Sequence, residues 1–109
     1  MLMETDMVNE MFLVRVKEDR LMANKAAEFR TTIADFVEAG NTKLVLDLSE
    51  VKFLDSSGLG AIVSIRKMVG TGGSLVLCGL TEQVRSVFRL TRMDTVFEIF
   101  EDATLEQAA

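Results

Sequence analysis

The sequence contains no histidine, and its 109 residues include a single cysteine, Cys78. The absence of histidine excludes a Ser–His–Asp triad, a histidine general base and a histidine-ligated metal site. One cysteine forms neither an internal disulfide nor a zinc site of the kind that clusters several cysteines. We therefore expect no metal site, no cofactor and no enzyme that depends on these groups.

Clustered positive charge and long apolar runs are also missing. Twelve Lys and Arg residues stand against 17 Asp and Glu residues, a formal net charge of −5. Nucleic acid is not an expected partner, because binding to phosphates needs clustered cations. The apolar runs are short, as where Asp47 interrupts Leu44–Leu46, and none approaches the ~20 residues of a membrane span. The acidic start, Met1–Asp6, does not resemble a signal peptide. We expect a cytoplasmic protein without membrane insertion.

The composition predicts one globular domain. Hydrophobic residues make up 49% of the chain and charged residues 27%, the balance of a folded protein rather than a disordered one. A chain of this length buries roughly two-thirds of its surface, enough for a core without disulfides or metal. Proline is absent, so no proline-rich linker divides the chain. We expect a single domain over 1–109, with short frayed ends at 1–8 and 103–109.

Strand patterns and helix patterns alternate along the chain. The strand patterns are short apolar or alternating runs, at 11–17, 43–48, 74–78 and 96–100. The helix patterns repeat every three or four residues, at 24–39, 57–69, 81–90 and 102–109, with Asn24 and Thr81 as expected N-caps. Strands separated by helices favour parallel pairing with right-handed crossovers. The predicted fold is α/β, with a central, mostly parallel sheet of four to five strands and about four helices.

The loop of six residues that begins at Asp55 joins a predicted buried strand to a helix. A helix start exposes unpaired N–H groups and about half a positive charge, so it can hold a phosphate. Ser56 and Ser57 supply hydroxyls there, and Asp55 is the one base nearby. The loop matches neither the Gly-x-Ser-x-Gly motif of hydrolases nor a phosphate-binding P-loop. A simpler interpretation is that the loop only caps the helix and that its two glycines only permit close packing.

The residues of this loop resemble a known signature. Phe53–Gly60, which reads Phe-Leu-Asp-Ser-Ser-Gly-Leu-Gly, together with Leu44–Val51, is similar to the signature of the STAS domain family, and more narrowly of the bacterial anti-sigma factor antagonists. The resemblance extends from about Met11 to Phe100 and includes Leu75–Leu80 and Val87–Asp94. It implies that the α/β domain is STAS-like.

The resemblance also implies a mechanism. In the antagonists, the serine directly after the aspartate is phosphorylated by a serine kinase of the GHKL ATPase class, often the anti-sigma factor itself. By this match the phosphorylated residue is Ser56, and the residues that support the site or bind the partner are Asp55, Ser57, Gly58, Leu59, Gly60 and Asp47. The unphosphorylated antagonist binds the kinase and relieves inhibition of its client, phosphorylation blocks binding, and a PP2C-type phosphatase reverses it. The resemblance therefore implies an interaction switch and not an enzyme.

One stretch departs from the family pattern. Many relatives have a Gly-Glu/Asp-Leu/Ile-Asp turn after the early strand, at an edge that often touches the kinase. Lys17–Met22 stands there in this chain, with Glu18 in place of the glycine and Leu21 near the usual acidic position. We therefore expect a kinase different from those of sporulation or general-stress systems. The client need not be a sigma factor, since relatives in other bacteria control secretion or biofilm programmes.

Two other functions stay open at this point. The chain could be a STAS subunit that is not phosphorylated, such as the small partner of a lipid-transport ATPase or a scaffold in a larger complex. It could also be an enzyme with Ser56 as the nucleophile, which the absence of histidine disfavours. Added phosphate after incubation with a kinase and ATP distinguishes the switch from the first alternative. Ester hydrolysis that disappears in Ser56→Ala would indicate the second.

Overall fold

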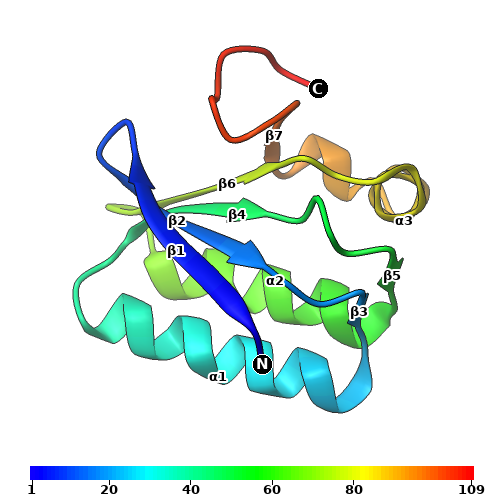
Figure 1. The fold of residues 1–109 in the computed structure, drawn as a ribbon, viewed down its shortest axis with the longest axis horizontal. Coiled ribbons are helices and arrows are strands. Elements are labelled where there is room, and N and C mark those ends of the chain that lie inside the picture. Colours follow the sequence, from blue (N-terminus) through cyan, green and yellow to red (C-terminus); the bar gives the residue numbers. More distant parts are fainter.

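The computed structural model describes all 109 residues, and a five-stranded sheet forms its centre (Figure 1). The strand order is β1-β2-β4-β6-β7, with the bounds β1 (Met3–Val8), β2 (Met11–Val16), β4 (Lys43–Asp47), β6 (Ser74–Cys78) and β7 (Glu98–Phe100). β1 runs antiparallel to β2, and every other pair in this sheet is parallel. The prediction of an α/β fold with a mostly parallel sheet of four to five strands is confirmed.

The central strand β4 is apolar on both faces because both faces are covered. Leu44 and Leu46 belong to the main core, while Val45 packs with Val76 and Cys78 in a smaller cluster on the other face. A strand buried in this way shows a continuous apolar run rather than an alternating one. The run was therefore visible in the sequence.

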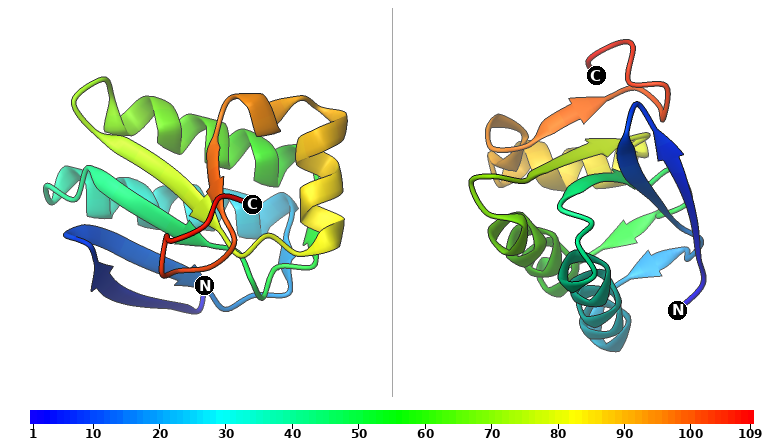
Figure 2. Two further views of the ribbon diagram at one scale, coloured as in Figure 1. Left: turned by 90° about the horizontal axis from the view of Figure 1, so that it is seen from above. Right: turned by 90° about the vertical axis from the view of Figure 1, so that its left-hand side faces the viewer.

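Two long helices, α1 (Ala23–Glu38) and α2 (Ser56–Val69), cover one face of the sheet (Figure 2). They bury apolar side chains at helical spacing, namely Ala26, Phe29 and Ile33 from α1 and Ile62 and Ile65 from α2. Full burial of a large apolar side chain stabilises the fold by about 1.5–3 kcal/mol. Both helices begin at the same end of the molecule (Figure 1). None of the helices combines the length and the apolar composition that a membrane crossing needs.

A second, two-stranded sheet lies at the end of the molecule where α1 and α2 begin (Figure 1). Its strands, β3 (Arg20–Leu21) and β5 (Phe53–Leu54), pair in parallel. The carbonyl of Asp19 extends the pairing by accepting hydrogen bonds from the N–H groups of Lys52, at 2.8 Å, and Phe53, at 3.1 Å. This small sheet was not predicted. It fixes the chain that leads into each helix.

The opposite face of the main sheet is covered by the C-terminal segment (Figure 2). Ala103 and Leu105 pack there against the smaller cluster, which contains Leu13, Val45, Val76 and Cys78. The third helix, α3 (Glu82–Leu90), is followed by a short 3-10 helix (Met93–Thr95). The structure therefore has three α-helices where about four were predicted.

The helix expected over 102–109 does not form. The carboxylate of Asp102 accepts hydrogen bonds from the N–H of Thr104, at 3.0 Å, and from its hydroxyl, at 2.6 Å. These bonds close a local turn, which competes with the start of a helix. The segment then returns to the sheet through a bridge between Phe100 and Ala108. Residues 103–109, where a frayed end was expected, thus contact the sheet again through this bridge.

Residues 1–8 were expected to be frayed, whereas Met3–Val8 form β1 and pair with β2 along its whole length. Asn9 and Glu10 form the two-residue turn between these strands, with φ angles of 49° and 65°. Two left-handed residues are typical of the tight hairpin turns that match the twist of a sheet. Glutamate is uncommon in that conformation, so Asn9 and Glu10 show no clear turn signal in the sequence.

The two predicted N-caps have different outcomes. α1 begins at Ala23, so Asn24 lies inside the first turn, and Met22 occupies the cap position without a side-chain hydrogen bond. Thr81 caps α3 as predicted, because its hydroxyl oxygen accepts from the N–H of Val84 at 3.4 Å. The same hydroxyl donates to the carbonyl of Val51 at 2.8 Å, which links α3 to the chain that follows β4.

Candidate functional site

Asp55 is the N-cap of α2, which agrees with the interpretation that the loop caps this helix. Its backbone is extended, and its Oδ1 accepts a hydrogen bond from the N–H of Gly58 at 2.9 Å. Its other carboxylate oxygen, Oδ2, accepts from the N–H of Ala23 at 3.3 Å. Asp55 therefore caps α2 and also binds the first residue of α1. This second contact was not visible in the sequence, because it joins residues 32 positions apart.

Ser56 and Ser57 are the first two residues of α2, and both are exposed. The first hydrogen bond of the helix runs from the N–H of Leu59 to the carbonyl of Asp55 at 3.0 Å. The N–H groups of the two serines lie before this bond and have no acceptor in the protein, as is usual for the first turn of a helix. Their hydroxyls make no hydrogen bond to other protein groups either. The start of α2 therefore presents two free hydroxyls beside two free backbone donors.

The serine hydroxyls make no hydrogen bond to a general base of the protein. Both oxygens of Asp55 already accept hydrogen bonds from backbone N–H groups, and the chain has no histidine. A serine nucleophile needs an adjacent base to remove its proton. The site can receive a group on Ser56 or Ser57 when a second protein supplies the base, and the positive end of α2 favours an anion there.

The two glycines of the loop play different parts. A Cβ at Gly58 would lie 2.1 Å from the carbonyl oxygen of Leu21 and 2.5 Å from Cδ1 of Leu54, so only glycine lets α2 pack against β3. A Cβ at Gly60 would meet nothing within 4 Å. The packing interpretation therefore holds for Gly58 but does not explain Gly60. Leu59, between them, is half-buried against the main core.

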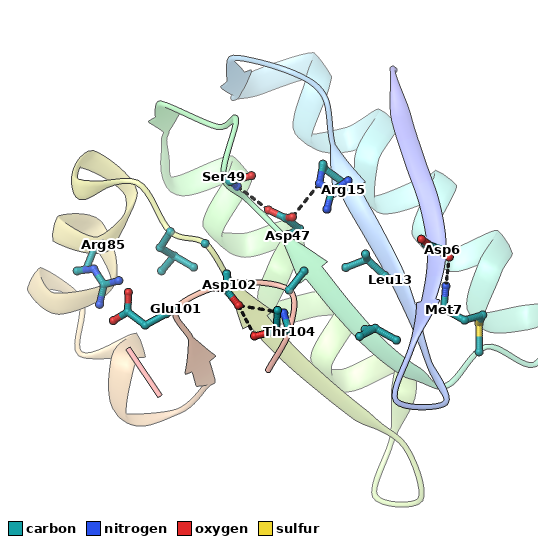
Figure 3. Close-up of a pocket in the computed structure, with 14 residues that line it drawn as sticks. Asp6, Met7, Leu13, Arg15, Asp47, Ser49, Arg85, Glu101, Asp102 and Thr104 are labelled. Atoms are coloured by element: carbon teal, nitrogen blue, oxygen red, sulfur yellow. Dashed lines mark hydrogen bonds and ion pairs between the residues drawn. The ribbon is translucent and has the colours of Figure 1, made fainter. Parts of the chain in front are cut away.

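The prediction grouped Asp47 with the loop Asp55–Gly60, which we call the serine loop. The structure places Asp47 at a different site. It lies at the end of β4 with 4% of its surface exposed, and it lines a cavity of about 680 Å³ on the face of the sheet opposite α1 and α2 (Figure 3). None of the residues from Asp55 to Gly60 lines this cavity. Its walls come from the β1–β2 hairpin, the ends of β4 and β6, α3 and the C-terminal segment.

The Asp47 carboxylate forms an ion pair with Arg15. Arg15 Nε donates to Oδ2 at 2.8 Å, while Oδ1 accepts from the N–H of Ser49 at 2.9 Å (Figure 3). The hydrogen bond from Arg15 to Asp47 is the main cause that raises the pKa of the guanidinium above its ordinary value. A Cβ at Gly79 would lie 3.2 Å from Oδ1, so the chain passes close to this pair. The ion pair ties β2 to β4.

Two residues near the serine loop were not predicted as part of the site. The guanidinium carbon of Arg20 lies 4.7 Å from the centre of the Phe53 ring, and Arg20 pairs with Phe53 across the small sheet. Strands of two residues are too short to show a period, so the sequence contained no signal for this contact.

Comparison with known proteins adds to this geometry. The family model of the STAS domain matches residues 3–107 of this chain. A candidate anti-sigma factor antagonist of Thermotoga neapolitana is 36% identical over 84% of this chain and 89% of its own length. The anti-sigma-B factor antagonist of Bacillus subtilis is 32% identical over 79% of this chain and 86% of its own length.

Solved structures show the same fold. The crystal structure of a candidate anti-sigma factor antagonist from Thermotoga maritima superposes with a TM-score of 0.81 at 28% identity, and the match covers 94% of this chain and 88% of the other. The Bacillus cell fate determinant SpoIIAA, in its phosphorylated form, gives a TM-score of 0.67 at 20% identity, covering 90% of each chain.

Proposed function

This chain belongs to the STAS domain family, among the anti-sigma factor antagonists, and from that membership we propose that it is a phosphorylation-controlled interaction switch. Unphosphorylated, it binds a serine kinase of the GHKL class or an equivalent regulator and relieves inhibition of that regulator's client. Phosphorylation of Ser56 blocks the binding, and a PP2C-type phosphatase restores it. Because the kinase needs ATP, we place the switch in the cytoplasm.

The observation that supports this proposal most directly is the exposed Ser56 hydroxyl at the start of α2. In the transfer step, a bond forms between Ser56 Oγ and the γ-phosphorus of ATP, and the bond from that phosphorus to the ADP oxygen breaks. The hydroxyl proton goes to a base of the kinase, since the chain has no histidine and the Ser56 hydroxyl makes no hydrogen bond to Asp55, whose oxygens bind backbone N–H groups. The phosphate then lies at the positive end of α2, beside the free N–H groups of Ser56 and Ser57.

The proposed switch acts by charge rather than by refolding. Phosphorylation adds about −1.5 to −2 charges, and it breaks no hydrogen bond of the Ser56 hydroxyl. A partner surface that fits a neutral hydroxyl then meets a dianion. A penalty of ~3 kcal/mol weakens the complex roughly a hundredfold, because 1.4 kcal/mol is a factor of ten. Backbone chemical shifts of the phosphorylated protein should therefore change near the start of α2 and stay constant across the main sheet.

Incubation with purified GHKL-class kinases of the same organism and ATP, followed by intact mass measurement, tests the proposal. We expect one added phosphate on the wild type and on Ser57→Ala, and none on Ser56→Ala. We also expect the phosphorylated protein to bind the kinase roughly a hundred times more weakly than the unmodified protein. A protein that no such kinase modifies, or one modified at Ser57 alone, would overturn the assignment of Ser56. The absence of any phosphate would favour an unphosphorylated STAS subunit.

A further inference from the structure

The cavity that contains Asp47 lies at the carboxyl ends of the parallel strands (Figure 3). Each of these strands contributes a residue at or just beyond its end, namely Arg15 from β2, Asp47 from β4, Gly79 after β6 and Glu101 after β7. In α/β sheets, the crevice beyond the carboxyl ends of the strands is the usual place for a ligand. The cavity volume of about 680 Å³ lies within the range of roughly 300–1,000 Å³ for small-molecule sites. The cavity therefore has the position and the size of a small-molecule site.

Arg85 is the cation of this cavity that has no partner in the protein. It comes from α3 and is half-buried, and its guanidinium forms neither an ion pair nor a hydrogen bond. Arg15, by contrast, donates to Asp47 at 2.8 Å. No fully buried nitrogen or oxygen of a side chain lacks a partner, so the guanidinium nitrogens of Arg85 reach solvent. Arg85 thus keeps its whole fork of donors for a ligand, and such a fork fits a carboxylate well.

Carboxylates outnumber guanidinium groups in the cavity lining by four to two. Three of them, Asp6, Asp47 and Asp102, accept hydrogen bonds from neighbouring groups of the protein. The fourth, Glu101, forms no ion pair and no side-chain hydrogen bond, and it lies at the same end of the cavity as Arg85 (Figure 3). The free charged groups at this end are therefore one guanidinium and one carboxylate.

These charges decide which kind of ligand fits the cavity. A simple anion would pair with Arg85 but would face the excess of carboxylates. A simple cation would pair with Glu101 but would face the free guanidinium. An uncharged apolar molecule would remove both groups from water without a new partner, and the burial of an unpaired charge is costly. A ligand that has both a carboxylate and an ammonium group supplies a partner for each.

We propose that this cavity binds an α-amino acid with an apolar side chain. The ligand carboxylate pairs with Arg85, and its ammonium group pairs with Glu101. Its side chain packs against the apolar part of the lining, which consists of Met7, Val8, Leu13, Leu80 and Ala103. An apolar wall with a few placed polar groups is the usual composition of a small-molecule site. The proposal does not depend on phosphorylation of Ser56, because no residue of the serine loop lines the cavity.

Isothermal titration calorimetry with the whole chain measures binding of L-leucine and L-phenylalanine. Isoamylamine and phenethylamine are the matched probes without the carboxylate, and isocaproate and hydrocinnamate are those without the ammonium group. This comparison uses the wild type alone, so it does not depend on the folding of a variant.

Two variants, Arg85→Gln and Glu101→Gln, remove one charge each from the cavity. The control for the first is Arg89→Gln, because Arg89 lines a smaller hollow of about 320 Å³ that Arg85 also borders, but not the cavity itself. The control for the second is Glu98→Gln, because Glu98 is exposed on β7 and lines a separate hollow. Circular dichroism checks that each variant is folded.

We expect at least one of the two amino acids to bind the wild type with a Kd of about 1 mM or lower, and its amine and acid analogues to bind at least tenfold more weakly. Arg85→Gln and Glu101→Gln should each weaken binding of that amino acid at least fivefold, and both controls should bind within twofold of the wild type. Binding of neither amino acid, an analogue that binds as well as its amino acid, or a smaller loss in Arg85→Gln or Glu101→Gln overturns the proposal. A loss of binding in Arg89→Gln equal to that in Arg85→Gln also overturns it, because the ligand would then occupy the smaller hollow.

Discussion

Asp55 and Ala23 join the starts of two helices. Asp55 Oδ2 accepts from the N–H of Ala23 at 3.3 Å, while Oδ1 accepts from the N–H of Gly58 at 2.9 Å. One carboxylate therefore meets the positive ends of both α1 and α2. Ala23 has a φ angle of 47°, which is uncommon for a residue with a Cβ, and the bond to Asp55 helps to hold it there. Asp55 thus positions the loop with Ser56 against the chain that enters α1.

Replacement of Asp55 should destabilise the protein through both contacts. Asp55→Ala removes the cap of α2 and the acceptor for Ala23, so we expect a loss of about 2 kcal/mol in the free energy of unfolding. Asp55→Asn keeps one acceptor oxygen and should lose about half as much. Urea unfolding at pH 7 measures both, with Ser57→Ala as the control that removes no hydrogen bond. Equal stability of Asp55→Asn and the wild type would show that the contact with Ala23 contributes nothing.

Replacement by alanine should change the stability of the protein in opposite directions at the two glycines of the serine loop. Gly58→Ala places a Cβ against the carbonyl of Leu21, at 2.1 Å before relaxation, and we expect a loss of at least about 2 kcal/mol from overpacking. Gly60→Ala meets no atom within 4 Å, and alanine in a helix is more stable than glycine by about 0.5–1 kcal/mol. Urea unfolding of the two variants compares them directly. A Gly58→Ala protein as stable as the wild type would contradict the close approach of α2 to β3.

Elements with a strong local pattern were predictable, and elements without one were not. Buried residues recur with a helical period along the helix from Ser56 to Val69, and they form a continuous run in the strand from Lys43 to Asp47. Both patterns are visible in the sequence. β1 was missed because it is an exposed edge strand with polar residues, joined to β2 by a turn with Glu10. The predicted helix over 102–109 failed because Asp102 uses its carboxylate for a local turn.

The serine loop was predictable for the same reason, since helix capping depends on neighbouring residues. The structure places Asp47 on the cavity side of the sheet, apart from the serine loop with which the prediction grouped it. Strand alternation contained the missing signal: Leu46 faces the helices, so Asp47 must face the other side of the sheet. The contact between Asp55 and Ala23, and the stacking of Arg20 on Phe53, depend on the tertiary fold. No local pattern indicates them.

The Arg15–Asp47 ion pair should matter more for stability than an exposed pair. The Asp47 side chain is 6% exposed and that of Arg15 is 33% exposed. Arg15→Ala therefore leaves the buried Asp47 carboxylate without the positive charge that offsets its burial. We expect a loss of about 2–3 kcal/mol, near the lower range for a broken buried pair. Lys17→Ala, which breaks the more exposed pairs with Glu50 and Glu4, should lose less than about 1 kcal/mol. Urea unfolding of both variants at pH 7 measures the contrast, and equal losses would contradict it.

Cys78 should make the protein less stable as the pH rises above 9. Burial is the main cause that raises the pKa of its thiol from 9.0 to about 12, and the charge of Asp47 raises it further. Between these values the unfolded thiol loses its proton while the folded thiol keeps it. The unfolded state then binds fewer protons, so the free energy of unfolding falls as the pH increases. At pH 10 this group should lower the stability by about 1.4 kcal/mol relative to pH 7.

Comparison of the wild type with Cys78→Ala isolates this effect, because the lysines titrate equally in both proteins. Urea unfolding between pH 7 and pH 10 should give two curves that are parallel up to about pH 8.5 and converge or cross above it, since only the wild type has the thiol. The folded wild type should also react slowly with a thiol reagent at pH 8, because Cys78 has no exposed surface and its protonated thiol is a poor nucleophile. Curves that stay parallel to pH 10, or fast labelling of the folded protein, would show that the thiol is not buried as the structure describes.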